Sequence, residues 1–323
     1  MSRIAALTGG TGFLGRHAAA ALAARGWRVR MLVRRAPDLP ELAEWPIEII
    51  PGALSDPGAL DRLVGGADVV IHMAGLVKAG SKAAFMAANV EGVAALARAW
   101  RAHAPDARFI LISSMAAREP GLSAYAASKR AGEDRLAALG AGGDWRILRP
   151  AAIYGAHDLE SLKVLKLADA PVQLMLNGAG ARVTMIDARD AGAAIAAFAE
   201  RPGGGATHEL TDARRSGYSW PELTRTAAMA LGRAPCAIRL PATALRLLGA
   251  CGGAAARLTG AAGMLTPGKA REILHADWSA DPALPAPPSA IWEPRIGLAE
   301  GLAHMAASAR AEGRLRSSRA HPS

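Results

Sequence analysis

Short apolar runs alternate with alanine- and leucine-rich stretches of helical length through the first 150 residues. Their lengths, four to seven residues, are typical of β-strands. They fall at 3–8, 28–33, 47–50, 68–74, 107–113 and 145–149. Because strands that alternate with helices favour a parallel, doubly wound sheet, we expect an α/β fold of the Rossmann type.

The alternation loosens after Pro150, where a smaller C-terminal substrate-binding domain is expected. One further strand and helix are predicted within 177–200, so part of this half should rejoin the first domain. We expect a dinucleotide-binding domain over 1–155 with 181–200 returning to it, a mainly substrate-binding region over 156–310, and a disordered tail over 311–323.

Three glycines punctuate the junction between the first predicted strand and the helix after it, in TGGTGFLG at 8–15. Gly9 permits a tight turn, Gly12 allows the backbone to approach a pyrophosphate, and Gly15 allows the helix to pack closely on the sheet. The helix N-terminus would supply free N–H groups to the phosphates. A glycine triplet in this strand-to-helix context predicts a dinucleotide site.

The end of the second predicted strand bears on which dinucleotide is bound. An NAD site usually has a carboxylate there for the ribose 2′-hydroxyl, whereas this strand ends in Val33 followed by Arg34 and Arg35. The two guanidinium groups could pair with a 2′-phosphate, which predicts NADP(H), with NAD(H) as the alternative. Two solvated arginines in an arginine-rich chain are the competing interpretation.

A serine, a tyrosine and a lysine stand at positions suited to carbonyl chemistry. Ser114 follows a predicted strand, and Tyr125 and Lys129 lie four residues apart on one face of the next helix. The chain has only three tyrosines and six lysines, so this spacing is rarely met by chance. A nearby cation favours the phenolate, so we expect the pKa of Tyr125 to move down toward neutral pH, where it could exchange a proton with a hydroxyl or carbonyl.

These motifs together resemble the short-chain dehydrogenase/reductase superfamily, specifically its extended NAD(P)-dependent epimerase/dehydratase branch. The matching pieces are TGGTGFLG (8–15), HMAG (72–75), NVEG (89–92), ISS (112–114), YAASK (125–129), LRPAAIYG (148–155) and IDARDAG (186–192). The run from 113 to 133 is more similar to a bacterial subgroup of atypical extended reductases that includes ceramide reductases.

The resemblance implies an NAD(P)-dependent oxidoreductase with Ser114, Tyr125 and Lys129 as catalytic residues. The sequence departs from the family pattern at Ala53, where many members carry an aspartate that contacts the adenine. That contact would be absent here or made by the Leu54 backbone. With the glycine loop and the two arginines, the expected cofactor contacts are Gly9, Gly12, Phe13, Leu14, Gly15, Arg34, Arg35, Leu54, Ala74, Gly75, Asn89, Lys129, Pro150 and Ile153.

Composition excludes several other functions. The formal charge of +10 accompanies no nucleic-acid motif, so we expect no nucleic-acid partner. Two cysteines, Cys236 and Cys251, cannot build a disulfide framework, and no cleavable leader is recognisable at the N-terminus, so a cytoplasmic location is expected. No histidine stands in a metal-ligand spacing, and we expect no metal site.

The remaining polar candidates have structural interpretations. His72, His157 and His208 are expected to serve in the core or in loops rather than in catalysis. Asp187 and Asp190 stand at a predicted strand-to-helix junction, where helix N-capping is the expected role.

The function, including the class of substrate, stays open between three hypotheses. A 3-oxo lipid reduced by NADPH leads, followed by a nucleotide sugar in an epimerase or dehydratase, and by a non-catalytic dinucleotide-binding subunit. The basic, small-residue-rich stretch 241–274 could lie on an anionic membrane surface or form a core helix pair, and is too interrupted to span a membrane. We expect an apolar small molecule as substrate and peripheral contact with an anionic membrane, and leave a homodimer open.

Overall fold

The computed structural model describes residues 3–35, 45–234, 236–259 and 265–315. Its centre is a seven-stranded sheet in the order β11-β6-β5-β4-β1-β2-β3, with all neighbours parallel. The strands are β1 (Ile4–Thr8), β2 (Arg28–Val33), β3 (Ile47–Pro51), β4 (Val69–His72), β5 (Arg108–Ile112), β6 (Trp145–Pro150) and β11 (Ala206–Leu210). The predicted Rossmann-type sheet is confirmed, and each of the six apolar runs forms one strand.

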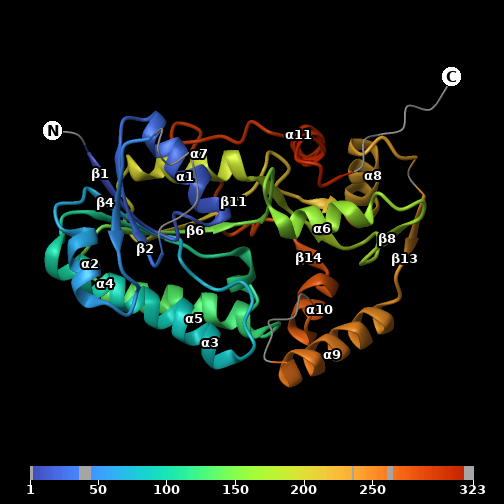
Figure 1. Ribbon diagram of the computed structural model, residues 1–323, viewed down its shortest axis with the longest axis horizontal. Coiled ribbons are helices and arrows are strands. Elements are labelled where there is room, and N and C mark those ends of the chain that lie inside the picture. The colour runs from blue at the N-terminus through green and yellow to red at the C-terminus, as the bar shows by residue number, and fades with distance from the viewer. Residues whose placement is uncertain (1–2, 36–44, 235, 260–264, 316–323) are drawn as a thin grey trace.

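Helices cover both faces of this sheet (Figure 1). The pair α1 (Phe13–Ala24) and α7 (Ala188–Ala199) lies on one face, and α2 (Pro57–Val64), α4 (Gly92–His103) and α5 (Ala124–Leu139) cover the other. A Cβ added to Gly192 would lie 2.7 Å from the carbonyl oxygen of His17, so α1 and α7 touch backbone to backbone. Because both faces are buried, the central strands are apolar along their whole length rather than on alternate residues.

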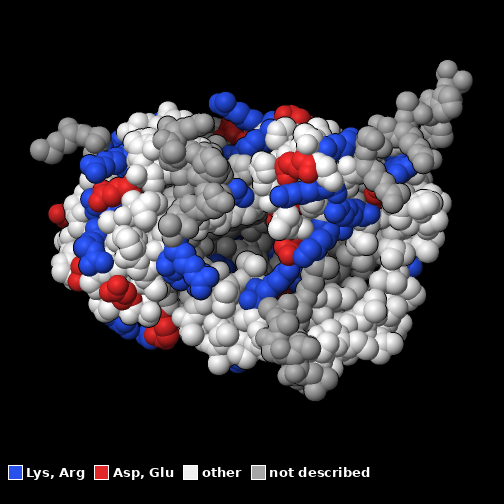
Figure 2. All heavy atoms as spheres, in the orientation of Figure 1, with Lys and Arg blue, Asp and Glu red and all other residues white. Residues whose placement is uncertain are grey.

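The order in which strands are added to the sheet reverses between β1 and β4. From β1 the chain crosses to β2 on one side, whereas from β4 it continues to β5 on the other. Thr8 pairs with His72, so both strands end at the same level. Open α/β sheets bind ligands in the crevice outside such a switch point. The space-filling view shows a hollow in the middle of the face turned toward the viewer, with basic side chains on its rim (Figure 2).

The rest of the chain builds short elements beside the carboxyl ends of these strands. The remaining elements are α3 (Lys82–Met86), the π-turn η2 (Ala87–Glu91), the 3₁₀ turn η3 (Met115–Arg118), β7 (Ala152–Tyr154), α6 (Leu159–Leu167), β8 (Gln173–Met175), β9 (Arg182–Val183), β10 (Met185–Asp187), β12 (Tyr218–Ser219), α8 (Trp220–Ala230), β13 (Ala237–Arg239), α9 (Ala242–Thr259), α10 (Pro267–Leu274), β14 (Asp277–Trp278) and α11 (Leu298–Ala311). Besides the two cores on the faces of the central sheet, the helices α6, α8 and α11 pack around a third apolar core that includes Tyr154, Leu302 and Met305. Three small sheets join β7 to β10, β12 to β9 and β14, and β8 to β13.

Two boundaries differ from those expected. The segment that returns to the first domain does not end at residue 200, because β11 pairs with β6 at the edge of the central sheet. The tail does not begin at residue 311 or 312, because Leu315 is buried in the third core and its amide donates to the Ala309 carbonyl. Residues 316–323 lie outside the described part of the chain.

Candidate active site

The glycine loop has the geometry that a pyrophosphate requires. Gly9 has a φ of +74°, a conformation that residues with a Cβ rarely adopt. A Cβ on Gly15 would lie 2.1 Å from the Gly9 carbonyl oxygen, so the loop closes only around glycine. Gly12 caps α1 without any side-chain hydrogen bond, and the first turn contains no acidic residue. The helix therefore presents its first N–H groups to an anion, as the expected dinucleotide would need.

The loop after β4 lies directly against the glycine loop. The position of a Cβ on Gly9 is 2.6 Å from the Ala74 amide nitrogen. That amide donates to the Thr8 hydroxyl at 3.3 Å, and the hydroxyl is 2.7 Å from Nδ1 of the buried His72. Burial, together with the charge of Lys129, lowers the pKa of His72 to about 3, so the ring is neutral. His72 thus has the structural role expected of it, tying β1 to β4.

Asn89 holds the same loop from the other side. It is buried in the π-turn η2, accepts from the Leu76 amide at 2.8 Å and donates to the Leu76 carbonyl at 3.0 Å. Its amide also donates to the Ser128 hydroxyl on α5 at 2.9 Å. A Cβ on Gly75 would lie 2.6 Å from the Asn89 side-chain oxygen and 3.6 Å from Nζ of Lys129. The 72–75 loop, η2 and the Lys129 ammonium therefore meet at one point.

Ser114, Tyr125 and Lys129 come together at the carboxyl end of β5. The Ser114 hydroxyl forms a hydrogen bond with the Tyr125 phenol, and Nζ of Lys129 donates to the Ile112 carbonyl at 3.0 Å. Ser123 caps α5 by accepting from the Ala126 amide at 2.9 Å, which fixes where the helix begins. As whole residues all three are partly buried.

The expectation of a lowered phenol pKa is wrong for Tyr125. Burial raises the pKa of Tyr125 to about 12, against the opposing hydrogen bond from Ser114 and with a further upward contribution from the charge of Glu272. Burial also lowers the pKa of Lys129 to about 8, partly offset by the negative charge of Glu133. Removal from water thus dominates both groups. At neutral pH the phenol carries its proton and the amine remains largely charged.

A buried ion pair behind the lysine was not predicted. Glu133, one turn beyond Lys129 on the same face of α5, accepts from Nε and Nη2 of Arg149 on β6 at 2.8 and 2.6 Å. Both side chains are almost fully buried. The spacing of Tyr125, Lys129 and Glu133 at i, i+4 and i+8 was visible in the sequence, but the partner on another element was not.

The remaining expected cofactor residues lie on several different elements. Phe13 and Leu14 begin α1. The ring of Phe13 meets the ring of His17 edge to face, with 5.4 Å between the ring centroids. Pro150 ends β6, Ile153 lies in β7, and Leu54 packs against the core beside Gly92. Arg34 and Arg35 are exposed directly after β2, and within the described part of the chain neither has an ion-pair partner. No contact in the described residues links these two arginines to the Ser114–Tyr125–Lys129 group.

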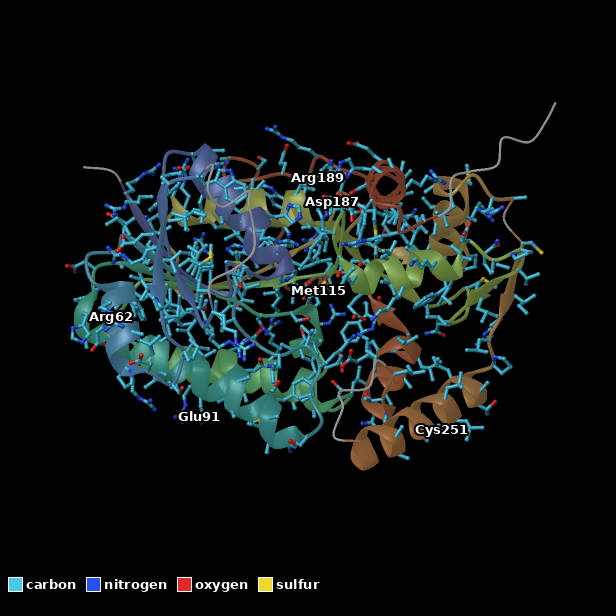
Figure 3. All side chains as sticks on the ribbon, viewed as in Figure 1. Arg62, Glu91, Met115, Asp187, Arg189 and Cys251 are labelled. Carbon is cyan, nitrogen blue, oxygen red and sulfur yellow. The ribbon has the colours of Figure 1, made fainter. Side chains whose placement is uncertain are left out.

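The other polar candidates have mostly structural contacts. Asp187 caps α7 and forms a two-pronged ion pair with Arg189, and Figure 3 shows the two side chains next to each other. The capping role expected of Asp190 is wrong, because its carboxylate accepts from the amides of Arg295 and Ile296, both at 2.8 Å.

His157 and His208 also lie outside the Ser114–Tyr125–Lys129 group. His157 pairs with Glu312 at 3.0 Å, and the buried His208 ring lies 5.0 Å from that of Phe198. Across the described ranges, no cluster of three or more His, Cys, Asp or Glu side chains could hold a metal ion.

The stretch 241–274 forms a helical hairpin. The α9 helix packs on α10 through small residues, and a Cβ on Gly249 would lie 3.0 Å from the Cβ of Ala270. On α9, Leu245 is buried, whereas Leu247 and Leu248 are 66% and 52% exposed. Cys251 lies on the same helix (Figure 3). None of the described helices is long and apolar enough to cross a membrane.

Comparisons with known proteins agree with this geometry. Residues 5–210 match the model of the NAD dependent epimerase/dehydratase family. The chain is 46% identical over 303 residues to the ceramide reductase of Caulobacter vibrioides, covering 93% of this chain and 92% of that protein. It is 32% identical over 177 residues to a farnesyl-dihydroquinoline-oxide ketoreductase of Stigmatella aurantiaca, covering 49% of this chain and 53% of that protein.

Solved structures share the fold at lower identity. The crystal structure of gox2253 matches with a TM-score of 0.75 at 23% identity, over 98% of this chain and all of that one. MoeE5 in complex with UDP-glucuronic acid and NAD matches with a TM-score of 0.71 at 21% identity, over 96% and 99%. The chain therefore belongs to the NAD dependent epimerase/dehydratase family, and is an enzyme of the NAD(P)-dependent oxidoreductase type.

Proposed function

We propose that this protein is an NADP(H)-dependent reductase that converts the ketone of a 3-oxo lipid, such as an oxidised ceramide or sphingoid base, to a hydroxyl. The observation that carries the proposal is the 46% identity to a ceramide reductase across 93% of the chain. The likeness to MoeE5 with UDP-glucuronic acid or UDP-glucose is 21% and 20% identity, which supports a shared fold and no more.

The proposed catalytic residues are Ser114, Tyr125 and Lys129. When bound, the reduced nicotinamide supplies the hydride. Tyr125 donates its proton to the carbonyl oxygen, a role that suits a phenol whose pKa is raised to about 12. Ser114 orients the same oxygen through its hydroxyl. Lys129, beside Gly75 and charged at neutral pH, stabilises the phenolate that remains after proton transfer.

The proposed preference for NADP(H) is supported by the end of β2. The strand closes on Val33, a buried side chain that cannot accept a hydrogen bond from a ribose hydroxyl. Arg34 and Arg35 follow in exposed positions from which a guanidinium could pair with a 2′-phosphate. NAD(H) would lose these charge-assisted contacts but keep those of the glycine loop.

The lipid substrate and contact with an anionic membrane are supported by α9. Its outer side carries the exposed Leu247 and Leu248 next to the exposed Arg246, and the helix contains no acidic residue. Leucines could enter the boundary between headgroups and acyl chains, while a basic residue near anionic headgroups is worth about 1 kcal/mol. The inner helix of the hairpin, α10, lies against Ser123, two residues before Tyr125.

The test compares substrates under identical conditions. NADPH consumption is measured with a 3-oxo ceramide in mixed micelles, and conversion of UDP-glucose and UDP-glucuronic acid is measured separately by chromatography of the sugar nucleotides, with Tyr125→Phe as the inactive control. We expect turnover of the lipid alone. Conversion of a sugar nucleotide without conversion of the lipid would overturn the proposal.

Membrane contact is tested by sedimentation with vesicles of phosphatidylglycerol and phosphatidylcholine. We expect salt-sensitive binding that the double variant Leu247→Asp/Leu248→Asp loses. The matched control is Met229→Asp on α8, a side chain that is equally exposed, at 64%, but lies on a helix distant from α9 in Figure 1. Equal binding by all three proteins would remove α9 from the membrane contact.

A further inference from the structure

One segment of the C-terminal half contacts both ends of the loop that separates Ser114 from Tyr125. We call this segment, residues 266–279, the clasp; it comprises α10, β14 and the residues between them. At the first end of the loop, Arg118 closes the 3₁₀ turn that begins after Ser114. Its guanidinium donates to the carbonyls of Ser279 and Asp277 at 2.7 and 2.9 Å.

At the second end, the clasp touches the N-terminus of α5. The hydroxyl of Ser123, which caps this helix, donates to the carboxylate of Glu272. Nε of Arg271 donates to the Leu122 carbonyl at 2.7 Å. The clasp and the N-terminus of α5 approach so closely that a Cβ on Gly268 would lie 2.8 Å from the Cβ of Ser123. The first turn of α5, which carries Tyr125, is therefore held by α10.

Glu272 is a buried carboxylate that the proposed chemistry does not use. It is 7% exposed, pairs with Nζ of Lys269 at 3.0 Å, and its backbone carbonyl accepts from Nε1 of Trp278 at 2.8 Å. These contacts fix the carboxylate in place. Its charge also acts on Tyr125: burial is the largest cause of the raised pKa of that phenol, and the charge of Glu272 raises it further.

We propose that Glu272 is a positioning residue for Tyr125, which holds the capped first turn of α5 through Ser123 and so sets where the phenol meets the substrate carbonyl. The proposal rests on the proposed role of Tyr125 as the proton donor. It places a residue of the substrate-binding half in control of the catalytic helix of the other half, 147 positions away in the sequence. A shift of the clasp would thereby move the phenol relative to the hydride donor.

The experiment compares Glu272→Gln, Ser123→Ala and Ser123→Thr with the charge-matched control Glu293→Gln, which alters an exposed carboxylate away from the clasp. Hydrogen exchange of the peptide spanning residues 122–127 needs no substrate. We expect faster exchange there in Glu272→Gln and Ser123→Ala, and wild-type exchange in Ser123→Thr, which keeps a capping hydroxyl. Exchange of the glycine loop and the affinity for NADPH should stay unchanged in every variant.

Turnover then separates positioning from mere support of the fold. Since a small misplacement can cost about 10²-fold, we expect kcat to fall by about 10- to 100-fold in Glu272→Gln and Ser123→Ala. The solvent deuterium isotope effect on kcat should rise, because proton transfer from a displaced phenol becomes rate-limiting. The two losses should not add fully in the double variant, since both act on the same contact between Ser123 and Glu272.

If Glu272→Gln and Ser123→Ala kept the kcat of the wild type, or had a lower kcat with an unchanged isotope effect, the proposal would be overturned. If the wild-type protein turned over no 3-oxo lipid, the proposed function would fail. The exchange data would still decide separately whether Glu272 holds the helix, and unchanged exchange in Glu272→Gln would overturn that part. Ser123→Ala covers the case in which Glu272→Gln does not fold, because it removes only a hydroxyl.

Discussion

The buried pair of Glu133 and Arg149 gives a stability prediction whose size follows from its surroundings. The two side chains are 4% and 9% exposed and share two hydrogen bonds. Removing one partner of such a pair leaves an uncompensated buried charge, at a cost of about 3–5 kcal/mol. We therefore expect Glu133→Gln and Arg149→Met each to lower the free energy of unfolding by an amount in this range.

The two single variants should differ in a definite order. In Glu133→Gln, the charges of Glu209 and Asp281 still act on Arg149, since both contribute to its raised pKa. In Arg149→Met, the buried Glu133 loses its ion-pair partner and the buried Glu209 loses one of the cations that act on it, so this variant should lie at the upper end of the range. The double variant Glu133→Leu/Arg149→Met should recover most of the loss, because no buried charge of the pair remains.

Urea denaturation followed by tryptophan fluorescence measures these differences. The control is Asp134→Asn, which changes an exposed carboxylate at the next position of α5. If the single variants cost less than about 1 kcal/mol, the range of an exposed pair, the pair is not buried in solution. If the double variant cost as much as the two singles together, the assumption that the two charges compensate each other would be refuted.

Three further predictions concern the chemistry. Tyr125→Phe should lower turnover by about 10²- to 10⁴-fold, the usual contribution of a positioned acid, and leave the calorimetric affinity for NADPH intact; full activity would assign the proton to another group. Replacing Arg34 and Arg35 together by alanine should narrow the preference for NADPH over NADH by about 1–3 kcal/mol in the same titration, and equal affinities in the wild type would contradict that role. Lys129→Met should abolish turnover and yet raise the melting temperature at pH 7.

Local pattern was sufficient to predict six strands of the central sheet and the proximity of Ser114, Tyr125 and Lys129. Strands buried on both faces are continuous apolar runs, so β1 to β6 stand out from their sequence alone. The trio was recognisable because Tyr125 and Lys129 share one helix and Ser114 ends the strand before it. The last strand of the sheet escaped because β11 contains His208 and Glu209, whose polar side chains hide its apolar neighbours.

Contacts between polar residues far apart in the sequence could not be predicted. Glu272 and Ser123 stand on different halves of the chain, and neither has a periodic pattern that points to the other. The pKa of Tyr125 was expected to fall because only the cation on its own helix was visible in the sequence. Its burial depends on the surrounding elements, and burial is the largest cause of its raised pKa.

The prediction for Lys129 follows from the sign of its pKa shift. Burial lowers the pKa of its amine from 10.5 to about 8, so between these values the unfolded chain binds more protons than the folded one, and the free energy of unfolding rises with pH. Below pH 8 the full cost of a desolvated ammonium is present. Methionine has a similar volume and no charge, so the variant should be more stable than the wild type at pH 7.

That advantage of Lys129→Met should shrink as the pH rises from 8 toward 10.5, because the wild-type lysine then loses its proton and its cost. Melting temperatures at four pH values between 7 and 10 measure this trend, with the exposed Lys82→Met as the control that should show none. A variant less stable than the wild type at pH 7, or a difference independent of pH, would mean that Glu133 compensates the ammonium fully. The predicted trend would instead show that Lys129 is kept at the expense of stability, which points to its charge as a requirement of the reaction rather than of the fold.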